Sequence, residues 1–207
     1  MKLLKKPFRY EVFHITFVLL ALFLVVFILP NFFPGTPGIL AMTTPGVMAG
    51  EWWQVFTYIF VHPSGQIFNL LGNMMVFFFF GLALEDQWGS WETGFFYLMI
   101  TLAVSGTTLG LSILTGEPAI LYGANALSYG VMMAWAAYNP NQQIYLMGII
   151  GVKAKWLLMG YMGLFTVLAF FNGGFYSLTN ILGALISALY LGIRHGVNVI
   201  KAFTSRD

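Results

Sequence analysis

The segment from Ile67 to Leu84 constrains the fold of this chain more than any other. Its side chains are apolar over nearly the length of a lipid span, apart from two strongly polar ones, Asn69 and Asn73. A helix that crosses a bilayer needs about 20 predominantly apolar residues. Residues four apart share one helix face, so the two amides point the same way. Because an amide inside a membrane needs a partner on a neighbouring helix, this face is expected to point into a bundle and not toward lipid.

The composition excludes a soluble globular protein. Of the 207 residues, 59% are hydrophobic and only 8% are charged, which is too few to cover a water-exposed surface. The chain has no cysteine, so disulfides and thiolate metal sites are excluded. The sequence has no metal-ligand cluster, phosphate loop or redox motif, so neither a metal nor a cofactor is expected. The basic residues form no continuous patch, so nucleic acid is not an expected partner.

The apolar pattern predicts an all-α membrane protein with six transmembrane helices in one domain over residues 1–207. The expected helices cover about residues 14–30, 67–84, 93–114, 123–138, 154–171 and 177–193. The first follows a basic stretch, as the core of a signal peptide does, but no small-residue cleavage site comes after it. We therefore expect this helix to remain in the protein.

The segment between the first two helices is rich in proline and aromatic residues. It contains GEWWQVFTYIFVH, whose Trp52, Trp53 and Tyr58 are expected among the lipid headgroups. A short acidic turn with Glu85, Asp86 and Glu92 is expected between the second and third helices.

The basic residues predict the orientation in the membrane. With six helices and a cytoplasmic N-terminus, all nine fall on the cytoplasmic side: Lys2, Lys5, Lys6, Arg9, Lys153, Lys155, Arg194, Lys201 and Arg206. Such a one-sided distribution is typical of cytoplasmic loops, so both termini are expected inside. Asn69, Asn73, Asn125 and Asn180 are then expected at similar depths below the outer surface. The short chain without an appended domain favours a bacterial inner membrane.

Four motifs, in this order and spacing, resemble the rhomboid family of intramembrane serine proteases. They are the interfacial GEWWQVFTYIFVH, the residues Asn73, Gly81, Glu85, Gly89 and Ser90, the tetrapeptide Gly123-Ala-Asn-Ala126, and Asn180-Ile-Leu-Gly183. The resemblance covers about residues 50–195. It implies a rhomboid-like bundle of six transmembrane helices with an interfacial outer loop after the first helix, in which the Glu85 position is structural.

The resemblance also implies where a catalytic site would lie. The family uses a serine nucleophile at the start of the fourth helix, a histidine base in the sixth, and a histidine and an asparagine in the second that help to hold the oxyanion. The corresponding positions here are Asn125 for the serine, Asn180 for the base, Asn69 and Asn73 for the oxyanion pair, and Gly123 and Gly183 for the motif glycines. Only Asn73 keeps the family's residue among the four polar positions.

These substitutions predict a loss of catalysis. A carboxamide is neither a nucleophile nor a base, and both members of the dyad are carboxamides here. Ser128, one helical turn after Asn125, is the alternative nucleophile candidate. None of the three histidines, His14, His62 and His195, is expected at the level of Ser128, so a substitute dyad is not predicted.

Three classes of function follow from these observations. The first is a pseudoprotease that binds or retains transmembrane helices of client membrane proteins. The second is an active rhomboid protease with a substitute nucleophile. The third is a structural or transporter-like protein, in which the asparagines only join helices at roughly 0.6–2 kcal/mol each. A transporter is the weakest of these, because the predicted spans carry no ionisable groups between their ends. The bilayer and client helices are the expected partners, whereas the client and the oligomeric state do not follow from the sequence.

Overall fold

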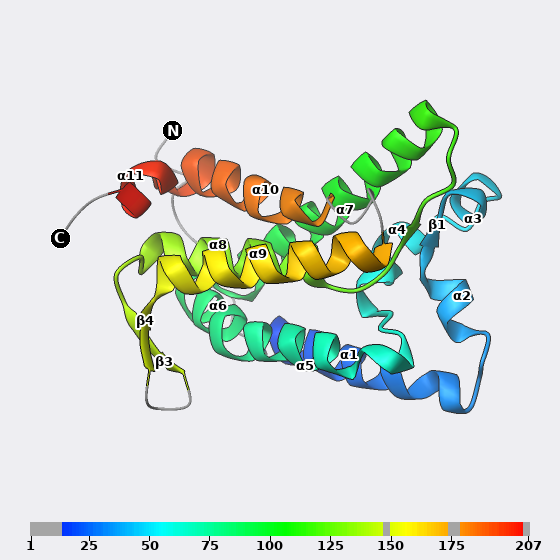
Figure 1. The fold of residues 1–207 in the computed structure, drawn as a ribbon, viewed down its shortest axis with the longest axis horizontal. Helices are drawn as coiled ribbons and strands as arrows, with labels where there is room; N and C mark the ends of the chain where they lie inside the picture. Colours follow the sequence, from blue (N-terminus) through cyan, green and yellow to red (C-terminus); the bar gives the residue numbers. More distant parts are fainter. Residues whose placement is uncertain (1–13, 147–149, 174–178, 205–207) are drawn as a thin grey trace.

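The computed structural model of the chain describes residues 14–146, 150–173 and 179–204. Its long helices lie side by side along the long axis of the molecule (Figure 1). They are α1 (Ile15–Ile28), a continuous helix made of α5 (Ile67–Val76), the π-helical η5 (Phe77–Gly81) and α6 (Leu82–Trp88), then α7 (Ser90–Thr115), α8 (Asn125–Tyr138), α9 (Ala154–Gly173), and α10 (Leu182–Tyr190) with the π-helical η7 (Leu191–His195).

Short elements complete the fold. They are η2 (Leu29–Asn31), α2 (Thr36–Leu40), α3 (Thr44–Met48), α4 (Gln54–Thr57), η3 (Tyr58–Phe60), η4 (Ser64–Gln66) and α11 (Val199–Thr204). Two antiparallel pairs join β1 (Met42–Thr43) to β2 (Ile120–Leu121), and β3 (Gln143–Leu146) to β4 (Ile150–Lys153). The segment with α2, α3 and α4 lies at one end of the molecule and the β3–β4 hairpin at the other (Figure 1).

Each of the six segments that were predicted as membrane helices contains a helix of the structure. Helix α8 begins at Asn125, two residues after the expected start, because Gly123 has a left-handed conformation. Among the residues that the structure describes, two helices, Ile67–Trp88 and Ser90–Thr115, are long and apolar enough to cross a membrane. The start of the sixth expected helix, at residue 177, lies outside the described residues. The number of membrane spans therefore stays a prediction.

The expectation of an acidic turn between the second and third helices is wrong. Helix α6 continues through Glu85 and Asp86 to Trp88, and Glu92 lies in the first turn of α7. Only Gly89 separates the two helices, with a φ angle of 88°. A residue without a β-carbon adopts this left-handed conformation at little cost, so a single residue suffices for the change of direction.

Glu85 joins α6 to the start of α1. Its carboxylate is buried and accepts hydrogen bonds from the backbone N–H groups of Ile15 at 2.6 Å and Thr16 at 3.0 Å. The first N–H groups of a helix have no partner within the helix, so this carboxylate caps α1 from a distant part of the chain. Thr16 also bonds Tyr97 of α7, with 3.1 Å between the two hydroxyl oxygens. The structural role implied for Glu85 is thus realised as a helix cap.

Helix α8 forms the centre of the bundle. Ten of its 14 residues are buried, and α10 packs closely against it. A β-carbon at Gly183 would collide with the carbonyl of Ala126, so the two backbones approach where glycine leaves space. Ser187, one turn after Gly183, is fully buried. The close packing of α10 on α8 thus uses small residues, as membrane helix pairs commonly do.

The segment between α1 and α5 is organised around Gln54. This side chain is fully buried; its Oε1 accepts from the N–H of Thr43 at 2.9 Å, and its Nε2 donates to Glu51 Oε2 at 2.5 Å.

Trp52 is exposed, as expected for an interfacial residue, but the same expectation is wrong for Tyr58. Tyr58 is buried because its hydroxyl reaches into the bundle and donates to the carbonyl oxygen of Thr101 at 3.2 Å.

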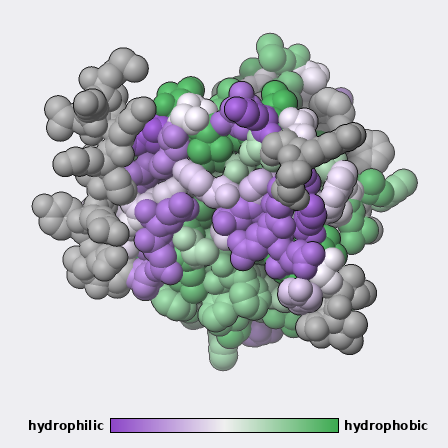
Figure 2. Space-filling view, turned by 90° about the vertical axis from the view of Figure 1, so that its left-hand side faces the viewer, coloured by the Kyte–Doolittle hydropathy of each residue, from purple (hydrophilic) through white to green (hydrophobic). Residues whose placement is uncertain are grey.

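Polar side chains gather at the end of the molecule opposite this segment. Figure 2 shows hydrophilic residues over much of this end, with hydrophobic residues along its lower margin. Below this surface, Glu92 is buried and its Oε1 accepts from Arg194 Nε at 3.0 Å and from the Tyr190 hydroxyl at 3.1 Å. These bonds fix the C-terminal end of α10 and η7 to the first turn of α7.

Candidate functional site

Three asparagines from two helices form one hydrogen-bonded group, here called the amide cluster (Asn69, Asn73 and Asn125). Asn69 Nδ2 donates to Asn125 Oδ1 at 3.0 Å. Asn73 Nδ2 lies 3.0 Å from Asn69 Oδ1 and 3.3 Å from Asn125 Oδ1. The first two residues lie one turn apart on α5, and the third is the first residue of α8. The prediction that the two amides of α5 point into a bundle is confirmed, and their partner is the start of α8.

Asn73 connects the amide cluster to Ser128 and His62. Ser128 Oγ donates to Asn73 Oδ1 at 2.7 Å, and Asn73 Nδ2 lies 3.1 Å from His62 Nε2. All three side chains are buried. The expectation that no histidine lies near the level of Ser128 is wrong for His62. The loop after η3 folds back onto the bundle, where Phe23 of α1 packs edge-on against the imidazole with 5.5 Å between ring centres.

The imidazole of His62 is neutral in this arrangement. Its Nδ1 lies 3.2 Å from the carbonyl oxygen of Phe60, which can only accept, so Nδ1 carries the proton. Nε2 is then the acceptor for the amide of Asn73. Burial in the loop between η3 and η4 lowers the pKa of His62 to about 4, because the charged form would lose its hydration. In the part of the chain that the structure describes, no hydrogen bond joins His62 to Ser128 Oγ.

Gly123 shapes the approach to α8. Its φ angle is 85°, and its N–H donates to the carbonyl oxygen of Tyr58 at 3.0 Å. A β-carbon at this position would lie 3.9 Å from both Asn69 Oδ1 and His62 Nε2. The glycine therefore lies against the cluster, and its left-handed conformation turns the chain so that Asn125 starts the helix.

Asn180 lies apart from the hydrogen-bonded group. It lies two residues before the start of α10, and Gly183, three residues later, packs on Ala126, the neighbour of Asn125. This contact places Asn180 at the same end of α8 as the cluster. The Asn180 side chain is 7% exposed and forms no hydrogen bond with the residues that the structure describes. The structure thus joins three of the four predicted site residues and leaves the fourth without a bond to them.

The geometry limits what this site can do chemically. Amides donate and accept hydrogen bonds but neither attack a carbonyl nor take up a proton at neutral pH. Ser128 is fully buried, and its hydroxyl proton points to an amide oxygen and not to a base. A general base needs a direct or water-bridged approach to that proton. The arrangement is suited to binding polar backbone groups.

His62 was the site residue that sequence reasoning placed wrongly. The signal that could have located it is its position at the end of the apolar run Tyr58–Val61, just before Pro63. An isolated polar side chain in an apolar segment is often buried with a partner, because burial without one costs free energy.

Comparison with known proteins gives the family of the chain. The model of the Rhomboid domain matches residues 49–196. A protein named RHOMBOID-like protein 1, from Arabidopsis thaliana, is 30% identical over a match of 118 residues that covers 53% of this chain and 28% of that relative. The match thus spans less than a third of the length of the plant protein. The domain match covers well over half of the present chain, which is therefore a member of the rhomboid family and an integral membrane protein.

Proposed function

We propose that this chain is a non-proteolytic rhomboid protein, a pseudoprotease that binds transmembrane segments of other membrane proteins. The observation that carries the proposal is the hydrogen bonding of Asn125. This amide takes the position at which the family places its serine, and its Oδ1 accepts hydrogen bonds from Asn69 and Asn73. An oxygen held in this way stabilises the helix pair and has no proton to give up for attack on a peptide bond.

The surroundings of Ser128 argue against a substitute protease. A serine nucleophile needs its hydroxyl at an accessible surface beside a base. Ser128 is fully buried and donates to Asn73 Oδ1, while the lone pair of His62 Nε2 is engaged by the same asparagine. Asn73 thus separates the hydroxyl from the imidazole, and activation would require both to break their bonds to it.

The amide cluster supports binding of a helix that is locally unwound. In lipid, each backbone N–H or C=O group without a partner costs several kcal/mol. Asn69 and Asn125 are only partly buried, so part of the cluster is reachable from outside. Amides can satisfy both donors and acceptors of an unwound backbone. We propose that a client helix approaches laterally, beside α5 and α9, and that its unwound part meets the cluster.

A purely structural role is the second candidate, and the mutual bonding of Asn69, Asn73 and Asn125 favours it. In that case the amides join α5 to α8 and contact no client. The two roles are compatible, but they predict different consequences when Asn125 is replaced.

The orientation in the membrane is part of the proposal. We propose six membrane spans with both termini in the cytoplasm. The distribution of the nine lysines and arginines supports this topology. The hydrophilic end with the β3–β4 hairpin would then face the cytoplasm, and the end with α2, α3 and α4 would face outward (Figure 1). A bacterial inner membrane stays a prediction.

A binding measurement tests the proposed function. Because the chain has no cysteine, a single cysteine at exposed Met48 can carry a donor fluorophore without interference. Energy transfer in proteoliposomes would then compare two acceptor-labelled peptides, one all-leucine and one with a central Asn-Gly-Pro break. We expect the broken helix to bind at least about fivefold more tightly, and Asn125→Leu to remove the difference.

The matched control is Thr107→Leu, which changes an exposed polar side chain on α7. It should leave the preference intact. Equal binding of both peptides to the wild type would contradict client recognition by the cluster. A preference that survives Asn125→Leu, with lowered thermal stability of that variant, would assign the amides a structural role alone.

A further inference from the structure

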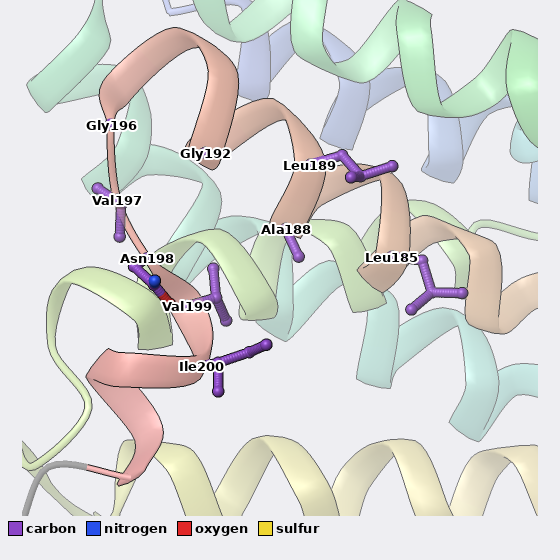
Figure 3. A pocket seen from close by; sticks show the side chains of 9 residues that line it. All are labelled: Leu185, Ala188, Leu189, Gly192, Gly196, Val197, Asn198, Val199 and Ile200. Carbon is purple, nitrogen blue, oxygen red and sulfur yellow. The ribbon is translucent and has the colours of Figure 1, made fainter.

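A groove lies between α10 and α11 at the hydrophilic end of the molecule. It has a volume of about 610 Å³, within the range of roughly 300–1,000 Å³ that is typical of small-molecule sites. Figure 3 shows the side chains of Leu185 and Ala188 on α10 and those of Val199 and Ile200 on α11 around one hollow. Asn198, at the start of α11, is the polar side chain among those that line it. The groove is thus apolar along its length and polar near one end.

The apolar part of the groove continues into the outer side of α10 and η7. Leu185, Leu189 and Ile193 follow one another at one-turn spacing and are 54%, 65% and 87% exposed. In an integral membrane protein such a side faces acyl chains. An apolar hollow is a poor site for water, which needs two to four polar partners. The lining is therefore suited to hydrocarbon.

The polar end of the groove is positively charged. Asn198 Oδ1 accepts from the backbone N–H of Lys201 at 2.9 Å, which places the exposed lysine directly beside the lining residues. At the other end of α11, Lys155 Nζ donates to the carbonyl oxygen of Phe203 at 3.3 Å. Residues 179–204 contain no acidic side chain. Neither lysine forms an ion pair with the residues that the structure describes, so their charges are available to an anion.

We propose that this groove binds an anionic phospholipid of the surrounding leaflet. One acyl chain lies along Leu185, Leu189 and Ile200, and the phosphate lies at α11, near Lys201 and Lys155. The charge distinguishes this occupant from a zwitterionic lipid, whose own ammonium group would offset the attraction. Basic residues at the membrane surface favour anionic lipids in this way. The site lies apart from the amide cluster and does not depend on the proposed client binding.

A quenching experiment on the full chain tests the proposal. Ala188→Cys, in a chain without other cysteines, carries a fluorophore inside the groove. The labelled protein is reconstituted in vesicles that contain either phosphatidylglycerol or phosphatidylcholine with brominated acyl chains. We expect stronger quenching by the brominated phosphatidylglycerol at equal mole fraction. The relative affinity for the anionic lipid should fall roughly fivefold in Lys201→Gln, as expected for one lysine near a charged membrane surface.

Two controls distinguish lipid binding in the groove from lipid contact elsewhere on the protein surface. Leu114→Cys, at a position that is 83% exposed near the end of α7, should report no preference between the two lipids. Lys153→Gln removes the same charge from the β3–β4 hairpin and should leave the preference at Ala188 unchanged. Equal quenching by both lipids at Ala188 would overturn the proposal. An equal loss in Lys153→Gln and Lys201→Gln would also overturn it, because the attraction would then come from the whole basic end.

Discussion

Asn73 takes part in more of the side-chain hydrogen bonds of the site than any other residue in it. Its Nδ2 faces His62 and the other two amides of the cluster, and its Oδ1 accepts from Ser128. An amide nitrogen has only two hydrogens, so its three acceptors share them. One side chain thereby joins α5, α8 and the loop before α5. Since Ser128 and His62 are buried, the removal of this amide would leave polar atoms of both side chains without their partner.

Asn73→Leu should destabilise the protein while keeping the volume of the side chain similar. We expect the free energy of unfolding to fall by about 1–3 kcal/mol, because buried donors and acceptors lose their partner. Reversible unfolding in mixed detergent micelles measures this change. Met75→Leu, at a 60% exposed position on the same helix, is the matched control and should be close to neutral. An equally small effect of both variants would show that the network contributes little.

His62 predicts a pH dependence of stability. Its pKa is lowered from 6.5 to about 4 in the folded protein, so the unfolded chain binds a proton more readily. The contribution of neutral His62 to the free energy of unfolding is therefore fully present above about pH 6.5. This contribution is lost as the pH falls from 6.5 toward 4. Unfolding measured from pH 8 to pH 4 should show this loss. In His62→Gln, which lacks the titrating group, the loss over this window should be smaller; an unchanged pH profile would contradict the assignment.

At the scale of helices, the cap of α1 depends on one carboxylate from α6. Glu85→Ala removes the acceptor for Ile15 and Thr16. We expect a loss of about 1–2 kcal/mol, as for other helix N-terminal caps. Gln87→Ala is the matched control, since this side chain on the same helix is exposed. Hydrogen exchange of the first turn of α1 should rise only in the Glu85 variant, and equal rates in both variants would argue against capping.

The contact between α8 and α10 predicts that alanine substitutions at two glycines differ strongly in their effect on stability. A methyl group at Gly183 would collide with the backbone of Ala126, whereas one at Gly160 on α9 meets no atom within 4 Å. Gly183→Ala should therefore separate the helices and cost about 3 kcal/mol or more. Gly160→Ala should be neutral or slightly stabilising, because alanine favours the helix. Thermal unfolding in detergent compares the two, and tolerance of Gly183→Ala would contradict the close packing.

For the whole molecule, the positions of the helices and the need of Asn69 and Asn73 for a partner in the bundle follow from the sequence. Apolar length predicts the helices, and an amide in an apolar helix requires a neighbour. The positions of Glu85 and His62 do not follow in this way. Glu85 bonds residues about 70 positions away in sequence, and His62 is buried by the path of a loop. Such partners depend on tertiary packing, which local patterns in a single sequence do not specify.

A cleavage assay tests whether the chain has lost catalysis. The wild type and the double variant Asn125→Ser, Asn180→His would be reconstituted in proteoliposomes with a fluorogenic rhomboid-type transmembrane substrate. We expect no cleavage by the wild type, and activity in the double variant would show that only the catalytic groups had been lost. Cleavage by the wild type that Ser128→Ala abolishes would contradict the proposed loss of catalysis and identify a substitute nucleophile.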